Sequence, residues 1–124
     1  MLRKDLYLQI YKRFANIHNF CVDKEACEDI IQGDRLFFGI CAKYHPKYKE
    51  EWYKLTTPLF IQDLDYIIKK LGWLDKKDWN VDEVICAIKR GDFVGYIIRT
   101  TRLNFTVDEF FELYQEYSNT TINL

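Results

Sequence analysis

The chain has 124 residues and a formal net charge of −1, with 48% hydrophobic and 17% aromatic residues. This length and apolar content predict one folded domain over residues 1–124, with ample aromatic side chains for a core. The near-neutral charge argues against a strongly basic nucleic-acid binder, and the scarcity of glycine and proline, five and two residues, argues against long low-complexity segments.

The first predicted element is a helix over residues 6–20. Asp5 lies near its start, where the helix dipole favours a negative charge. Apolar residues recur at spacings of three and four, which is the pattern of one helix face. We expect that face to be buried through Leu6, Ile10, Phe14 and Ile17.

A second helix is predicted over residues 22–32. Gly33 follows it, and glycine is common just past a helix end because it tolerates positive φ. Asp34 is a suitable N-cap for the next segment, RLFFGICAKY. That segment has a helical stripe, but its short apolar run LFFGI also suits a buried strand.

Two prolines suggest two further helix starts. Pro46 can begin a helix because its missing N–H group has no helical partner at that position. Thr57-Pro58 has the same form, a capping residue followed by proline, and predicts a new helix that ends at Lys69, Lys70 and Gly72.

A short phrase occurs twice in the second half of the chain, as WNVDE at residues 79–83 and FTVDE at residues 105–109. Each copy reads as a capping box, with Asn80 or Thr106 at the N-cap and a glutamate three residues later. The Arg90-Gly91-Asp92 tripeptide between them is interpreted as a helix end, and Gly91 is expected to have positive φ.

These elements predict an all-α fold, a compact bundle of six to seven short helices. The alternative is an α+β fold with a short β-hairpin made from residues 36–41 and 93–98. Both segments are short apolar runs that contain aromatic residues.

The four cysteines are expected to be free thiols in a reducing cytoplasm, because the N-terminus leads directly into a polar, periodic segment and no apolar run is long enough to span a membrane. A zinc site can be drawn from four residues, but no Cys-x2-Cys pair supports it. We therefore expect no metal and no cofactor. The four residues are Cys21, Cys27, Cys41 and His45.

One short pattern is relevant to catalysis. Arg13 and His18 have an Arg-x4-His spacing, which resembles the signature of HEPN-type ribonucleases, a family of small all-α domains. The resemblance covers six residues and implies that both side chains would act on an RNA phosphate. The alternative is that Arg13 is a solvated residue and His18 a helix-end residue that faces the dipole.

Residues 43–54, KYHPKYKEEWYK, combine lysines with aromatic residues. This mixture suits a protein-binding surface, where Trp and Tyr are enriched. It also suits the stacking and phosphate contacts of a nucleic-acid surface, or a core-facing aromatic stripe with lysines outside. The partner-binding candidates in this segment are Lys43, Lys47, Tyr48, Lys49, Trp52 and Tyr53.

The last predicted helix has an acidic edge opposite its apolar residues. A solvated face is the plain interpretation, and a surface for a basic partner is the alternative. The partner-binding candidates on this edge are Glu109, Glu112 and Glu116.

From the absence of catalytic motifs we expect a non-catalytic, cytoplasmic protein with no membrane association. Its abundant aromatic and charged residues favour a protein partner, so an inhibitor or an immunity or anti-defence protein is the leading hypothesis. Phage anti-CRISPR proteins share this build. Such a chain would block a toxin or nuclease by steric occlusion. A helical nucleic-acid-binding regulator and a HEPN-like ribonuclease are the alternatives.

Overall fold

The computed structural model describes residues 1–32 and 37–122. Within them lie seven α-helices, two 3₁₀ turns and no strand, apart from one isolated bridge between Leu2 and Thr121. The predicted all-α class is confirmed. The β-hairpin alternative is wrong, because its described residues form a 3₁₀ turn, Phe37–Gly39, and parts of two helices.

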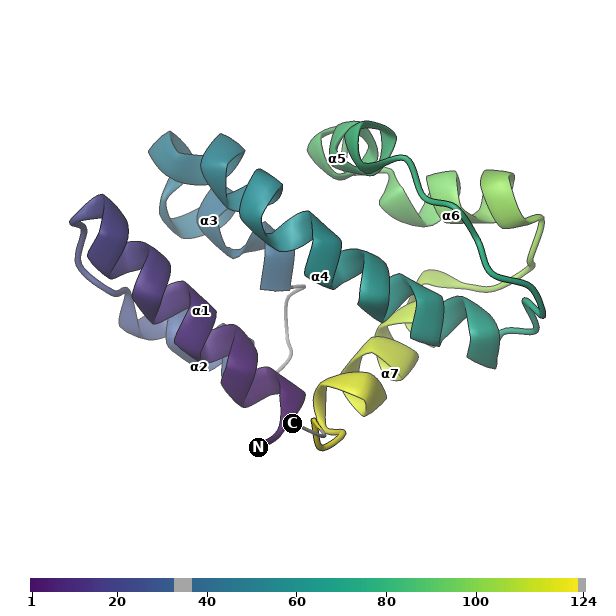
Figure 1. Cartoon of the computed structure of the whole chain (residues 1–124), viewed down its shortest axis with the longest axis horizontal. Coiled ribbons are helices and arrows are strands. Elements are labelled where there is room, and N and C mark those ends of the chain that lie inside the picture. The colour runs from purple at the N-terminus through teal and green to yellow at the C-terminus, as the bar shows by residue number, and fades with distance from the viewer. Residues whose placement is uncertain (33–36, 123–124) are drawn as a thin grey trace. The chain divides into compact units, whose positions relative to one another are not determined.

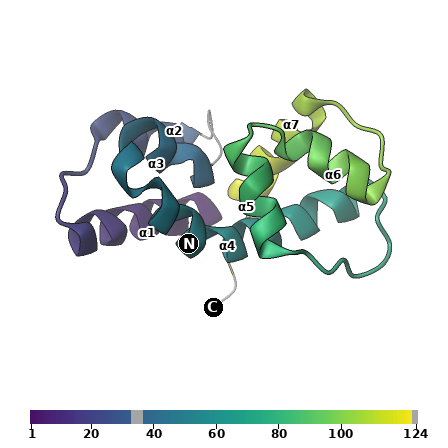
Figure 2. The same cartoon turned by 90° about the horizontal axis from the view of Figure 1, so that it is seen from above.

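The described chain forms two compact units, residues 1–52 with the C-terminal segment from Ser118, and residues 53–117. Figures 1 and 2 show α1, α2 and α3 in the first unit and α5, α6 and α7 in the second, while α4 contributes to both. A single domain over residues 1–124 stays a prediction. The helices are α1 Arg3–His18, α2 Lys24–Gln32, α3 Ile40–Tyr44, α4 Lys49–Lys70, α5 Val81–Lys89, α6 Phe93–Thr101 and α7 Val107–Ser118.

The core of the first unit is aromatic. Helix α1 buries Tyr7, Tyr11 and Phe14. Tyr7 stacks on Phe37 with ring centroids 4.4 Å apart. The aliphatic face expected from the sequence is wrong in part, because Ile17 is 68% exposed. Aromatic rings on the neighbouring face remove more area from water and so determine which side of α1 turns inward.

Helix α2 begins two residues later than predicted. Asp23 is its N-cap, since the Asp23 carboxylate accepts a hydrogen bond of 3.0 Å from the N–H of Ala26. Such a bond satisfies one of the N–H groups that have no partner within the helix. The predicted stop at Gly33 and the predicted N-cap Asp34 lie outside the described residues.

Helix α4 is longer than predicted. Pro46 starts a 3₁₀ turn, Pro46–Tyr48, that leads directly into α4. Thr57-Pro58 does not begin a helix and lies inside α4. The Thr57 hydroxyl donates to the Tyr53 carbonyl. Proline at position 58 has no N–H to donate to the Lys54 carbonyl, so α4 continues through this point with one helical hydrogen bond fewer.

The helix starts predicted at Asn80 and Thr106 are confirmed, but only the Thr106 copy has both hydrogen bonds of a capping box. The Asn80 side chain accepts a 3.0 Å hydrogen bond from the N–H of Glu83. Thr106 and Glu109 form a reciprocal capping box, with both hydrogen bonds at 3.1 Å. Gly91 has φ of 71°. These caps and turns hold α5, α6 and α7 around a core that includes Phe60, Leu64, Ile67, Val84, Ile97, Phe110 and Tyr114.

Candidate functional site

Tyr11 and His45 form a partly buried polar contact inside the first unit. The Tyr11 hydroxyl accepts a 2.9 Å hydrogen bond from the N–H of Asp23 and lies 2.6 Å from Nε2 of His45. Burial raises the pKa of Tyr11 to about 12, so the phenol keeps its proton. Burial also lowers the pKa of His45. A neutral His45 that accepts from the phenol fits both shifts.

Both histidines of the chain pack in one aromatic cluster. His45 lies 4.1 Å from the Phe20 ring, and His18 lies 4.2 Å from the Phe14 ring, centroid to centroid. Tyr48 completes the packing, because it stacks on Phe20 at 5.0 Å and lies 5.2 Å from His18. Both histidine side chains therefore contribute to the packing of the first unit.

The geometry of α1 does not favour the HEPN-like alternative. His18 is five positions after Arg13, and at about 100° per residue their side chains point roughly 140° apart around the helix. Arg13 is exposed, whereas His18 is half-buried against Phe14. The two side chains therefore leave α1 in different directions.

The lysines of residues 43–54 lie outside their aromatic neighbours. Lys43 lies 3.6 Å from the Asp29 carboxylate and 4.8 Å from the centroid of the Tyr44 ring. The Lys47 ammonium lies 5.7 Å from the Tyr48 centroid. We call Lys43, Lys47 and Lys49, all exposed, the lysine face.

Two of the predicted partner-binding residues are not on the surface. Trp52 has no exposed area, and Tyr53 is 4% exposed. Tyr48 is half-buried. The expectation of a surface made by lysines and open aromatic rings is therefore corrected, because Trp52 packs against Phe14 and Phe37 in the core.

The acidic edge of α7 is largely occupied by contacts within the second unit. Glu109 belongs to the capping box, and Glu116 accepts a 2.7 Å hydrogen bond from Tyr66. Lys70 also approaches Glu116 at 3.9 Å. Glu112 is exposed. This edge has less free carboxylate for a partner than the sequence suggested.

No three Cys, His, Asp or Glu side chains of the described part of the chain converge to hold a metal ion. In the zinc set drawn from the sequence, Cys41 is buried and Cys21 is exposed. Nε2 of His45 is in contact with Tyr11. Burial raises the pKa of Cys41 to about 12, which disfavours the thiolate that zinc needs.

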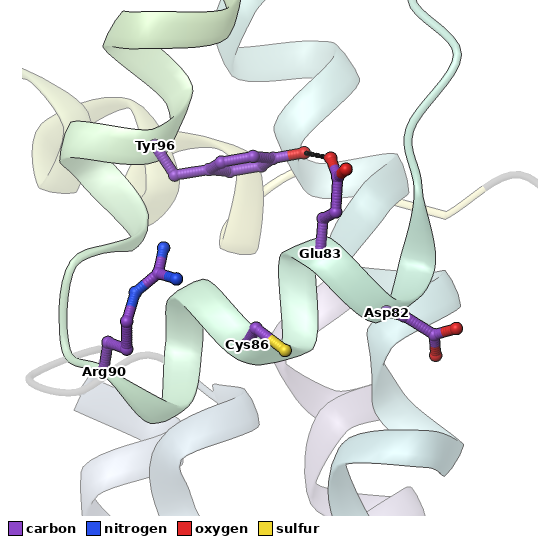
Figure 3. A pocket seen from close by; sticks show the side chains of 5 residues that line it. All are labelled: Asp82, Glu83, Cys86, Arg90 and Tyr96. Atoms are coloured by element: carbon purple, nitrogen blue, oxygen red, sulfur yellow. Dashed lines mark hydrogen bonds between the residues drawn. The ribbon is translucent and has the colours of Figure 1, made fainter.

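A groove between α5 and α6 was missed by the sequence interpretation (Figure 3). Its volume is about 500 Å³. Tyr96 reaches from α6 to Glu83 on α5, and its hydroxyl donates a 3.2 Å hydrogen bond to the Glu83 carboxylate. The helical spacing of the α5 residues could have indicated a shared face, but Arg90 was interpreted only as a helix end. The lining residues are Asp82, Glu83, Cys86, Arg90 and Tyr96.

The described helices include none with the length and apolar content needed to cross a membrane. Comparisons with protein-family models, with curated proteins and with solved structures found no match for this chain. The surfaces described above are therefore the basis for assigning a function.

Proposed function

We propose that this chain is a non-catalytic, cytoplasmic protein that binds another protein, as an inhibitor or an immunity or anti-defence protein does. It would act by steric occlusion of the active or binding site of a toxin, a nuclease or another defence effector. The observation that supports this proposal is the lysine face, where three lysines are exposed while Trp52 and Tyr53 of the same segment are buried.

The covered rings favour a protein partner over a nucleic acid. Single-stranded nucleic acids bind by stacking bases on open aromatic faces. Trp52 is fully buried, and the Tyr48 ring is stacked on Phe20 with Lys47 near it. The face therefore offers cations while neither Trp52 nor Tyr53 is open for base stacking, and the net charge of −1 adds no general attraction to phosphates.

The lysine face suits an acidic protein surface. Lys43 and Lys47 lie near the rings of Tyr44 and Tyr48. The Tyr44 hydroxyl donates a hydrogen bond to Asp29, and the Tyr48 ring stacks on Phe20, so both rings are held in place. Contacts of this kind restrict long side chains before binding, so less conformational entropy is lost when a partner docks. We expect acidic residues of the partner to lie against this face, with association slowed by salt.

The proposed absence of catalysis is supported by the positions of the histidines. They are the side chains whose ordinary pKa is best suited to proton transfer at neutral pH. His45 is in contact with Tyr11, and His18 packs between Phe14 and Tyr48. A role in packing accounts for both residues.

An affinity capture with charge-reversed variants tests the proposal. The variant Lys43→Glu/Lys47→Glu/Lys49→Glu is expected to lose a protein that the wild-type chain captures from nuclease-treated host lysate. Its matched control reverses three exposed lysines elsewhere and should keep that protein. The control positions are Lys12, Lys24 and Lys69. The captured protein should also lose its own activity on titration with the purified wild-type chain.

Two results would favour the alternatives. Capture of nucleic acid alone, with an affinity that falls steeply with salt, would support the nucleic-acid-binding regulator. RNA cleavage by the purified chain that disappears in His18→Ala would support the ribonuclease. Equal loss of the partner in both triple variants would show that total charge, and not the lysine face, controls capture.

A further inference from the structure

The exposed face of α5 carries acidic residues at one end and basic residues at the other. Asp82 and Glu83 stand in its first turn, and Lys89 and Arg90 stand at its end. All four are exposed, and Cys86 is exposed between them. The opposite face is turned into the core of the second unit through Val84, Ala87 and Ile88.

The charges are arranged in two pairs with the same spacing. Glu83 and Arg90 are seven residues apart, and so are Asp82 and Lys89. Seven residues make about two helical turns, so the members of each pair lie along the same side of α5. At about 100° per residue, Glu83 and Arg90 lie on one side of the direction of Cys86, and the other pair lies on the opposite side.

The side that carries Glu83 and Arg90 is open as well as charged. Both residues line the groove of about 500 Å³ between α5 and α6 (Figure 3). The Glu83 carboxylate is held there by the Tyr96 hydroxyl at 3.2 Å. The Glu83 side chain is therefore positioned at the surface, where a second helix could approach it.

We propose that α5 binds α5 of a second copy of this chain in an antiparallel pair whose two-fold axis passes next to Cys86. That symmetry places Glu83 of one copy opposite Arg90 of the other, and Asp82 opposite Lys89. Each ion pair then forms twice, as an interface between identical faces requires. A parallel pair would place like charges opposite each other, so the charge order selects the antiparallel arrangement.

Cys86 lies at the centre of the proposed interface. Its side chain is small, which lets the two helices approach closely at the axis, and it is uncharged, so no buried charge is left there. Exposed ion pairs are individually weak and are screened by salt. We therefore expect a dimer that forms at high protein concentration and whose dissociation constant rises by about an order of magnitude between low and high salt.

Charge reversal with sedimentation velocity tests the interface. Asp82→Lys/Glu83→Lys makes the face entirely basic, and Lys89→Glu/Arg90→Glu makes it entirely acidic. Each variant alone is expected to dimerise at least tenfold more weakly than the wild type, and an equal mixture of the two should form a heterodimer. The fourfold exchange, which combines both sets of substitutions, should restore self-association. Circular dichroism checks that each variant is folded.

Disulfide trapping of the wild-type chain gives a second test that needs no charge variant. Oxidation by copper–phenanthroline and O₂ takes two electrons from two thiols, and both protons leave to solvent as the S–S bond forms. We expect covalent dimers that are lost in Cys86→Ser and kept in Cys21→Ser, since Cys21 is also exposed. A wild-type chain that stays monomeric at about 1 mM, charge variants that dimerise as the wild type does, or trapping through Cys21 to the same extent would each overturn the proposal.

Discussion

Replacement of Tyr11 by Phe removes one hydroxyl from the core of the first unit and leaves the aromatic ring. The ring contact with Trp52, edge-on at 6.2 Å, should remain. The hydroxyl is the partner of two groups, the N–H of Asp23 at 2.9 Å and Nε2 of His45 at 2.6 Å. The substitution therefore isolates the polar contribution of this position.

The expected cost is about 1–3 kcal/mol of unfolding free energy, because each partly buried group that loses its partner bears a desolvation penalty. His45 is only half-buried, so water can reach that side of the contact and the lower half of the range is favoured. Tyr48→Phe is the matched control. Its ring also packs in the aromatic cluster, and its hydroxyl takes part in none of the hydrogen bonds found among the described residues, so a change within about 0.5 kcal/mol is expected.

Urea unfolding followed by tryptophan fluorescence measures the effect. Trp52 is the single tryptophan of the first unit, while Trp73 and Trp79 belong to the second. A Trp73→Phe/Trp79→Phe background therefore reports the first unit alone. Equal unfolding free energies for Tyr11→Phe and Tyr48→Phe would refute the reasoning, because the Tyr11 hydroxyl would then contribute nothing to stability.

Three further predictions concern single side chains. Burial lowers the pKa of His45 in the folded chain below its value in the unfolded chain, so the unfolded state binds more protons. The unfolding free energy should therefore fall as pH drops from about 6.5 toward the folded pKa. Thermal melts of His45→Gln should show a smaller loss of stability over the same pH range. Thr106→Ala should cost about 1 kcal/mol in urea unfolding, and Thr106→Ser should restore most of it. A Cβ on Gly95 would meet the Asp92 carboxylate, which pairs with Arg99 at 3.0 Å. Gly95→Ala should therefore stabilise by about 0.5–1 kcal/mol in an Asp92→Ala background and by less in the wild type.

Features governed by neighbouring residues could be predicted from the sequence. Asn80, Thr106 and Gly91 act as expected because a cap or a positive-φ turn depends on a few consecutive residues. Asp23 was missed as a cap although it acts by the same chemistry. The predicted start of α2 at residue 22 was therefore two residues too early.

Features decided by packing could not be predicted in the same way. The buried side of α1 depends on Phe37 and Trp52, which are distant in sequence and supply the rings that Tyr7 and Phe14 meet. Thr57-Pro58 has a local signal for a helix start. Residues on both sides of it, Tyr53 and Phe60, are buried in one continuous helix, and their packing outweighs a single lost hydrogen bond.

The same distinction between local sequence and packing applies to the candidate sites. Periodicity predicted that the lysines at positions 43, 47 and 49 lie outside, because charged residues rarely tolerate burial. It could not decide whether Trp52 and Tyr53 were surface or core, since aromatic residues are common in both. The groove between α5 and α6 depends on the contact of Tyr96 on α6 with Glu83 on α5. The spacing of residues within a single helix cannot predict a contact between two helices.

The two proposed surfaces belong to different units, and this gives a last prediction. The lysine face lies in the first unit and α5 in the second, with no residue in common. Substitutions without shared partners are usually additive, so reversal of Lys43, Lys47 and Lys49 should leave the self-association constant unchanged in sedimentation. A dimer also presents two lysine faces, which strengthens binding to a surface-immobilised partner through effective concentration. The Asp82→Lys/Glu83→Lys variant should therefore bind an immobilised partner more weakly than the wild type, but bind the same partner in solution with an equal one-to-one affinity. A loss of affinity in solution would mean that α5 contacts the partner directly.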